Sequence, residues 1–364
     1  MNQLIHEIRH NPLFWLLVFV PVVLVGVALR PDSYTLLFVL SVLAIVPLAG
    51  LLSHATESVA AKTGDAVGGL LNATLGNLTE LIIALAALRA GQYMLVKASI
   101  AGAIVTNTLF VLGASFLIGG LKYHVQEFNR SSARLQSGLL FLATVALLVP
   151  SAAAGAESAL AADFAQQLSL GLAVLLIVAY GLGMVFSLKT HRELFASAEH
   201  GEGGETPWPI GLALATLAGV TVLVALVSEV FVESVQEAAK AFGMTPAFVG
   251  FIVVALVGGA AEMVAAFSAA RKNRLDLSVG IAMGSAAQIA LFVAPVLVLA
   301  SYVIGPSPMG LQFWPGAVVM VLISTVTASM VTTSGRSSWF VGVLALMVYL
   351  TFAMTLYLLP PGLR

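Results

Sequence analysis

The chain has 364 residues, of which 60% are hydrophobic and only 9% are charged, with a mean hydropathy of +1.03. Because a soluble domain carries about 25% charged residues, this composition excludes an ordinary soluble protein. The 16 Lys and Arg residues nearly balance the 17 Asp and Glu residues, and no basic block suited to nucleic acid occurs. Cysteine is absent, which excludes disulfides, iron–sulfur clusters and thiolate chemistry.

Long uncharged apolar blocks predict an all-α polytopic membrane protein. A spanning helix needs about 20 apolar residues, and the blocks lack the polar–apolar alternation of barrel strands. The segment before the first block, MNQLIHEIRHN, is too weakly basic for a signal peptide, so the first span is interpreted as a retained helix. In chain order we expect eleven spans, at residues 13–29, 34–52, 66–88, 98–121, 136–154, 168–188, 209–232, 247–270, 278–301, 313–332 and 339–359.

The distribution of Lys and Arg predicts the orientation of these spans. With a cytoplasmic N-terminus, most basic residues, among them Lys122, Arg134 and Arg271, fall in cytoplasmic segments, as the positive-inside rule requires. An odd number of spans then places the C-terminus outside. Short loops and the lack of a targeting segment suggest a prokaryotic inner (plasma) membrane.

The two halves of the chain resemble each other. Residues 68–111 align with residues 250–293 without a gap, at a constant offset of 182 that matches Glu80 with Glu262. The third span enters from the inside and the eighth from the outside, so the repeats are inverted, as in many secondary transporters. We expect an N-terminal transmembrane helix at 1–33, a five-helix repeat at 34–188, an acidic cytoplasmic loop at 189–208 and a second five-helix repeat at 209–364.

Glu80 and Glu262 are the mid-span carboxylates of the two repeats. A charge at mid-membrane costs at least about 2.5 kcal/mol, so such residues mark functional sites by default. The alternative is a protonated Glu in a structural hydrogen bond, but two such residues at matching positions favour function. Glycines just before each Glu loosen the helix and free backbone carbonyls. Carboxylates with carbonyls suit Ca²⁺, whereas a soft metal lacks Cys or a partnering His.

The same two carboxylates suggest a coupling mechanism. Both ionised together in a low-dielectric site, they repel each other and resist desolvation. One Ca²⁺ neutralises both, and protons do likewise. Occupancy by metal or by protons is then mutually exclusive, and the empty, doubly charged site is disfavoured during the inward–outward change. We therefore expect exchange of Ca²⁺ for H⁺.

Other polar residues are predicted to support the site or the proton pathway. Those on the spans that follow each Glu are Thr106, Asn107, Ser285 and Gln288. Interhelical hydrogen bonding is an equal alternative for each of these four. Three further acids, Glu57, Glu229 and Glu233, lie near span ends, where they either line aqueous entrances or simply occupy the membrane interface.

The motifs around both carboxylates resemble the cation/proton exchanger (CAX) family of the Ca²⁺:cation antiporter superfamily. The resemblance lies in HATE at 54–57, GGLLNATLGNLTELI at 68–82, Ser228-Glu229 and GGAAE at 258–262. It implies an eleven-helix fold that exchanges Ca²⁺ for H⁺, with Glu80 and Glu262 binding the ion and Asn77 beside the first. Asn107 and Gln288 also match polar site positions of the family.

Two residues depart from the family pattern in the second repeat. Gly259 stands where the family usually has Asn, and Met263 stands where it has His. The loss of an amide ligand and an imidazole bears on cation selectivity and proton affinity. The sodium/calcium exchanger branch typically carries Pro before each Glu, but here those positions are Thr79 and Ala261.

Several competing functions remain to be weighed. A Na⁺ (or K⁺)/H⁺ antiporter on the same fold is the main alternative, and a passive channel is a weaker one. We do not expect an enzyme, because the chain lacks paired mid-span Asp residues and an HExxH motif for intramembrane proteolysis. No cofactor is expected beyond the transported Ca²⁺ and H⁺. The expected partner is the lipid bilayer, and a homo-oligomer is left open.

Overall fold

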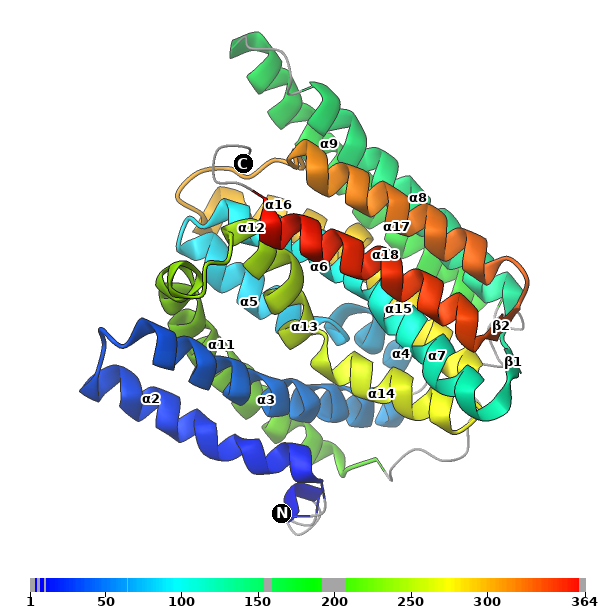
Figure 1. The fold of residues 1–364 in the computed structure, drawn as a ribbon, viewed down its shortest axis with the longest axis horizontal. Coiled ribbons are helices and arrows are strands. Elements are labelled where there is room, and N and C mark those ends of the chain that lie inside the picture. The colour runs from blue at the N-terminus through cyan, green and yellow to red at the C-terminus, as the bar shows by residue number, and fades with distance from the viewer. Residues whose placement is uncertain are drawn as a thin grey trace.

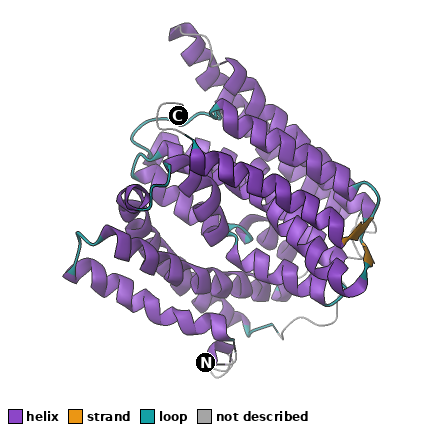
Figure 2. Cartoon of the chain, in the orientation of Figure 1, coloured by secondary structure: helices purple, strands orange, loops and turns teal. Residues whose placement is uncertain are grey.

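The protein folds as a bundle of helices in a computed structural model that describes residues 4, 7–9, 11–63, 65–153, 159–191 and 207–359. Figure 2 shows that helices make up nearly all of this part of the chain, with one short pair of strands. This agrees with the all-α membrane fold predicted from the uncharged apolar blocks. The expected acidic loop at 189–208 falls mostly outside the described residues.

The first half of the chain contains the elements up to residue 190. They are η1 (Pro12–Val18), α2 (Phe19–Leu29), α3 (Tyr34–Lys62), α4 (Asp65–Leu75), α5 (Leu78–Arg89), α6 (Tyr93–Val105), η2 (Thr106–Val111), α7 (Leu112–Tyr123), β1 (Val125–Glu127), α8 (Arg130–Ala153), α9 (Ala159–Val185) and η3 (Phe186–Thr190). Here η1 is a 3₁₀ helix, and η2 and η3 are π-helical segments.

The second half repeats this pattern of long and interrupted helices. Its elements are α11 (Ile210–Ala241), α12 (Pro246–Phe248), η5 (Val249–Val254), α13 (Ala255–Gly258), α14 (Ala260–Arg271), α15 (Leu275–Gln288), η6 (Ile289–Val293), α16 (Ala294–Ile304), α17 (Pro315–Thr332), β2 (Arg336–Ser338) and α18 (Trp339–Leu358). The π-helical segment η2 begins with the predicted site residues Thr106 and Asn107, and η6 directly follows Gln288. Such segments occur often at functional sites.

Among the described residues, nine helices are long and apolar enough to cross a membrane. The helix pair Pro246–Gly258 and Ala260–Arg271 is bent by 60° at its break, and counting it as one further span gives ten. The third predicted span, at 66–88, corresponds to the shorter helices α4 and α5, which are interrupted at Gly76 and Asn77. The expected count of eleven spans therefore stays a prediction.

Two helices continue beyond the predicted ends of their spans. The second span was expected to end at residue 52 but α3 continues to Lys62, and the seventh was expected to end at 232 but α11 continues to Ala241. Hydropathy marks where a helix leaves the hydrocarbon core of the membrane. The helix itself continues beyond that point as long as a neighbouring helix packs against one of its faces. Here α3 and α11 pack along each other, and the ring of Phe38 stacks on that of Phe231 with their centroids 5.4 Å apart.

The helices form three groups across the bundle (Figure 1). The helices α2, α3 and α11 lie side by side at one edge, and α8, α9 and α17 lie at the opposite edge. The interrupted helices α4–α6 and α12–α15 lie between these groups. At one end of the bundle, β1 pairs antiparallel with β2, with Val125 opposite Ser338, and this joins the start of α8 to the start of α18.

Candidate cation site

Both predicted carboxylates lie just after a helix break. Asn77 occupies the N-cap position of α5 and Glu80 lies in its first turn. In the second repeat, Gly259 occupies the N-cap position of α14 and Glu262 lies in its first turn. The breaks fall where glycines were predicted to loosen the helix. A carboxylate in the first turn is stabilised by the positive end of the helix dipole, which lowers the cost of placing it within a membrane protein.

The two carboxylates face one glycine. A Cβ atom at Gly259 would lie 3.7 Å from Oε1 of Glu80 and 3.8 Å from Oε2 of Glu262. A Cβ at the preceding residue, Gly258, would lie 2.9 Å from Cγ of Glu80. The absence of side chains at these two positions thus lets the carboxylates approach a common space.

The carboxylate oxygens in this space lack hydrogen-bond partners. Among the described residues, neither oxygen of Glu80 nor Oε2 of Glu262 has one, although all three atoms are buried. Buried polar atoms are nearly always hydrogen-bonded, and an unpaired buried charge is costly. The donor set of this site therefore suits a bound cation or protons.

A chain of buried polar side chains adjoins Glu80. The amide nitrogen of Asn107 donates to Oγ of Ser285 at 3.1 Å, and this hydroxyl donates to Oδ1 of Asn77 at 2.6 Å. The structure thus joins the predicted ligand Asn77 to two of the predicted supporting residues, one from each repeat. The other amide atom of Asn107, Oδ1, is buried without a partner and is free to accept from a donor or bind a cation.

Gln288 and Thr106 occupy equivalent repeat positions but lie in different surroundings. A Cβ atom at Gly76 would lie 3.2 Å from Oε1 of Gln288, so this amide adjoins the break before Glu80. Oγ1 of Thr106 instead shares a 3.3 Å hydrogen bond with the hydroxyl of Tyr349 on α18. In the described structure Thr106 thus makes an interhelical hydrogen bond, which is the alternative given for it from the sequence.

The three predicted entrance acids are exposed. Glu57 on α3 accepts from Oγ of Ser53 at 3.3 Å. Glu229 on α11 accepts from Nη1 of Arg89 at 3.1 Å, and Glu233 lies one turn further along the same helix. Glu57 lies beside the start of α11 and Glu229 near its end, so the two acids lie toward opposite ends of the bundle, and their role at aqueous entrances stays a prediction.

A narrow cavity beside Glu80 was not anticipated. Apart from the carboxylate, its wall is almost wholly apolar, and its lining residues are Ala84, Ser99, Ile100, Ala103, Val254, Ala255, Ile289 and Val293. The polar residue in this set, Ser99, has no motif around it, and neither has Tyr349 on α18. The sequence therefore carries no signal that selects either one.

Close backbone contact seals one side of the site. A Cβ at Gly102 of α6 would overlap the backbone of Phe251 in η5, and a Cβ at Gly250 would lie 2.5 Å from Cβ of Ala98. The repeat equivalent of Gly102 is Gly284 on α15, where a Cβ would meet only Nε2 of Gln136, at 3.5 Å. Within the described residues no comparable packing joins α15 to α4. The site is therefore closed toward the Arg89 end.

Comparison with known proteins gives consistent matches along the chain. The profile of the family described as sodium/calcium exchanger protein matches residues 33–189 and 212–358. The chain is 39% identical over 366 residues to a Ca²⁺/H⁺ antiporter of Aphanothece halophytica, covering 97% of this chain and 98% of that protein. It is also 39% identical to the Ca²⁺/H⁺ antiporter ChaA of Bacillus subtilis, covering 96% and 100% of the two chains. Among solved structures, native YfkE superimposes with a TM-score of 0.82 at 35% identity, covering 95% of this chain and 100% of its own.

Proposed function

Because the chain belongs to the sodium/calcium exchanger family, we propose that it is a secondary antiporter that exchanges Ca²⁺ for H⁺ across a membrane by alternating access. Its relatives with this degree of identity are named Ca²⁺/H⁺ antiporters, which are transporters and not enzymes. The resemblance of its motifs to cation/proton exchangers is thereby confirmed.

The observation that carries the proposal is the pair of carboxylates that face Gly259. Glu80 and Glu262 come from different repeats, and their buried oxygens have no protein partner in the described structure. Ca²⁺ takes 6–8 oxygen ligands and favours carboxylates with amide or carbonyl oxygens. In the proposed site both carboxylates bind the ion, and the amide oxygens of Asn77 and Asn107 supply neutral ligands.

The same arrangement accounts for coupling. One Ca²⁺ neutralises both carboxylates, and protons replace it when it leaves, so the pair is seldom ionised and empty. An empty, doubly charged site is costly in a low-dielectric environment, and this cost suppresses conversion between the inward and outward states without cargo. A single Na⁺ leaves one carboxylate uncompensated unless that group also holds a proton.

Transport by the purified protein tests the proposal. In proteoliposomes with an acidic interior, Ca²⁺ added outside is expected to dissipate the pH gradient, read by a fluorescent pH indicator, while radioactive Ca²⁺ accumulates inside. Parallel additions of Na⁺, K⁺ and Mn²⁺ measure selectivity. If Na⁺ dissipates the gradient and Ca²⁺ does not, the protein is a monovalent cation/H⁺ antiporter and the proposal is wrong.

The protein is an integral membrane protein, and we propose that its N-terminus is cytoplasmic in a prokaryotic inner membrane. Lys122, Arg271 and Arg336 lie at one end of the bundle, near the paired strands, and the positive-inside rule favours that end as cytoplasmic. The natural absence of cysteine provides a clean background for a test. In intact cells, an impermeant maleimide is expected to label Ser307→Cys but not Thr333→Cys, and the reverse result would invert the topology.

A further inference from the structure

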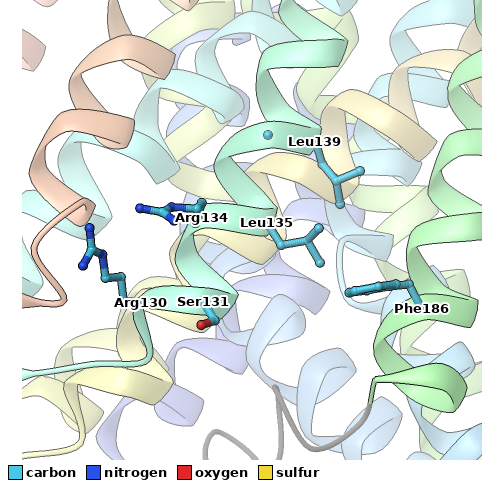
Figure 3. A pocket seen from close by; sticks show the side chains of 7 residues that line it. Arg130, Ser131, Arg134, Leu135, Leu139 and Phe186 are labelled. Carbon is cyan, nitrogen blue, oxygen red and sulfur yellow. The ribbon is translucent and has the colours of Figure 1, made fainter.

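A large groove lies at the end of the bundle that carries the paired strands, away from Glu80 and Glu262. It has a volume of about 660 Å³, within the range of small-molecule pockets. Its walls come from the first turns of α8 and from η3 at the end of α9 (Figure 3), and its lining residues are Arg130, Ser131, Arg134, Leu135, Gly138, Leu139 and Phe186.

The start of α8 fixes the order of these side chains. Oδ1 of Asn129 accepts from the backbone nitrogens of Ser131 and Ser132, each at 3.0 Å, and so caps the helix. Arg130, Arg134 and Gly138 then follow at intervals of four and form one row along the helix. A Cβ at Gly138 would meet nothing within 4 Å, so the row ends in open space above the second arginine.

Both arginines are exposed cations without an ion-pair partner among the described residues. Two neighbouring acids among the described residues are engaged elsewhere. Glu127 pairs with Arg336 at 2.8 Å, and Oδ1 of Asp276 accepts from the backbone nitrogen of Asn129 at 2.7 Å. Within the described part of the chain, the groove therefore carries two positive charges that no acid pairs with.

The opposite wall of the groove is apolar and continues onto the outer surface of the bundle. Figure 3 shows Arg130 and Arg134 extending to one side of α8, with Leu135 and Leu139 turned toward Phe186 on the other. Further along the two helices, large apolar side chains are exposed, among them Phe141, Val145, Val178 and Leu182. Charge thus gives way to apolar surface from the end of the bundle toward its middle, as it does along a phospholipid.

We propose that this groove binds one anionic phospholipid, with its phosphate held by Arg130 and Arg134 and an acyl chain lying over Gly138 against Leu139 and Phe186. Arginine forms bidentate contacts with phosphate, and basic pockets between transmembrane helices on the cytoplasmic side are suited to anionic head groups. A polar, acidic peptide segment would satisfy the arginines but would leave the apolar wall uncovered. The proposal is independent of which cation the protein transports.

Native mass spectrometry of the purified chain tests this site. Titration with phosphatidylglycerol is expected to yield one bound lipid with roughly tenfold higher affinity than phosphatidylcholine. The double variant Arg130→Gln/Arg134→Gln is expected to lose this preference while still binding both lipids weakly. The variant Gly138→Leu fills the groove and is expected to weaken the binding of both lipids. Arg271→Gln/Lys272→Gln removes the same charge at exposed positions of the same end and is expected to behave as wild type.

Three outcomes would overturn the proposal. If Arg130→Gln/Arg134→Gln and Arg271→Gln/Lys272→Gln lose the preference for phosphatidylglycerol equally, only the overall positive charge of this end of the bundle determines lipid binding. Displacement of the lipid by inorganic phosphate at the same concentration would mean that the site takes the anion and not the acyl chain. Conversion of an oligomer to a monomer by Gly138→Leu, with lipid binding unchanged, would mean that a second copy of the chain occupies the groove.

Discussion

The two inverted repeats differ most where their interrupted helices cross. In one crossing, α6 of the first repeat lies against η5 of the second, with Gly102 in contact with the backbone of Phe251. In the equivalent crossing, Gly284 of α15 meets only a side-chain amide. Related sequences in the same positions thus pack differently. Alternating access by inverted repeats therefore predicts that the two crossings exchange this packing during transport.

The repeats also differ in the chemistry that they bring to the carboxylates. The first repeat supplies Asn77 and Asn107, and their equivalents in the second are Gly259 and Ile289. Conversely, Ser285 of the second repeat corresponds to Ala103 of the first, which lines the apolar cavity beside Glu80. The polar side chains therefore gather around Asn77, while the equivalent position in the second repeat is Gly259. The ion is expected to depend more on the first repeat for its neutral ligands.

The largest expected effect comes from the buried carboxylate that both repeats share, Glu80 in the first and Glu262 in the second. Glu80→Gln and Glu262→Gln should each lower Ca²⁺ transport by roughly 100-fold or more, because a single remaining carboxylate does not neutralise a divalent ion in a buried site. Proteoliposome uptake of radioactive Ca²⁺ measures this loss, with the exposed residue Glu237 changed to Gln as control. If either site variant transports at the wild-type rate, the carboxylates do not share the ion.

The next effect tests the difference in packing at the crossings. Gly102→Ala should lower the stability in detergent by about 1–3 kcal/mol, because the added methyl group overlaps backbone that is unable to move aside. Gly284→Ala should change it by less than about 0.5 kcal/mol, yet slow transport, because the other state requires close packing there. Thermal unfolding and Ca²⁺ uptake measure the two quantities. Equal destabilisation by both substitutions would show that the crossings are alike in solution.

The sequence predicts much of this architecture because charge placement in a membrane protein is strongly constrained. The polytopic helical fold, the helix breaks and the pairing of Glu80 with Glu262 follow from apolar length, glycine and the cost of buried carboxylates. The ends of α3 and α11 do not follow, because they depend on packing between helices. The partner of Thr106, the hydroxyl of Tyr349, is equally impossible to predict, since it lies 243 residues away in the chain and no motif marks it.

The asymmetry of the polar ligands leads to a gain-of-function prediction. Gly259→Asn should raise the affinity for Ca²⁺ roughly tenfold, because the new amide would enter the space between the carboxylates and add a neutral oxygen ligand. The backbone at Gly259, with φ of −80° and ψ of 14°, accepts an ordinary side chain. The nearest atom to its Cβ would be the carbonyl oxygen of Ala255 at 3.2 Å, which requires only a small adjustment.

Calorimetric titration of Ca²⁺ into purified Gly259→Asn measures this gain. The matched control is Gly259→Ala, which adds the same Cβ without an amide and should not bind more tightly than wild type. Asn77→Gly makes the reverse change in the first repeat and should weaken binding. If Asn and Ala at position 259 bind Ca²⁺ equally, the second repeat does not present its N-cap residue to the ion.

The smallest expected effect concerns the ion pair at the closed end. Arg89 and Glu229 join α5 to α11 at 3.1 Å, but their side chains are 75% and 50% exposed, and exposed pairs contribute only about 0–1 kcal/mol. Arg89→Gln should therefore shift the balance between the two states by no more than roughly fivefold, and salt should reduce the shift further. Labelling of single cysteines placed on either side of the site reports this balance. If the charge swap Arg89→Glu/Glu229→Arg restores the wild-type labelling pattern, the shift is due to the ion pair itself. If the shift persists in the swap, it is due to the loss of side-chain packing at the closed end.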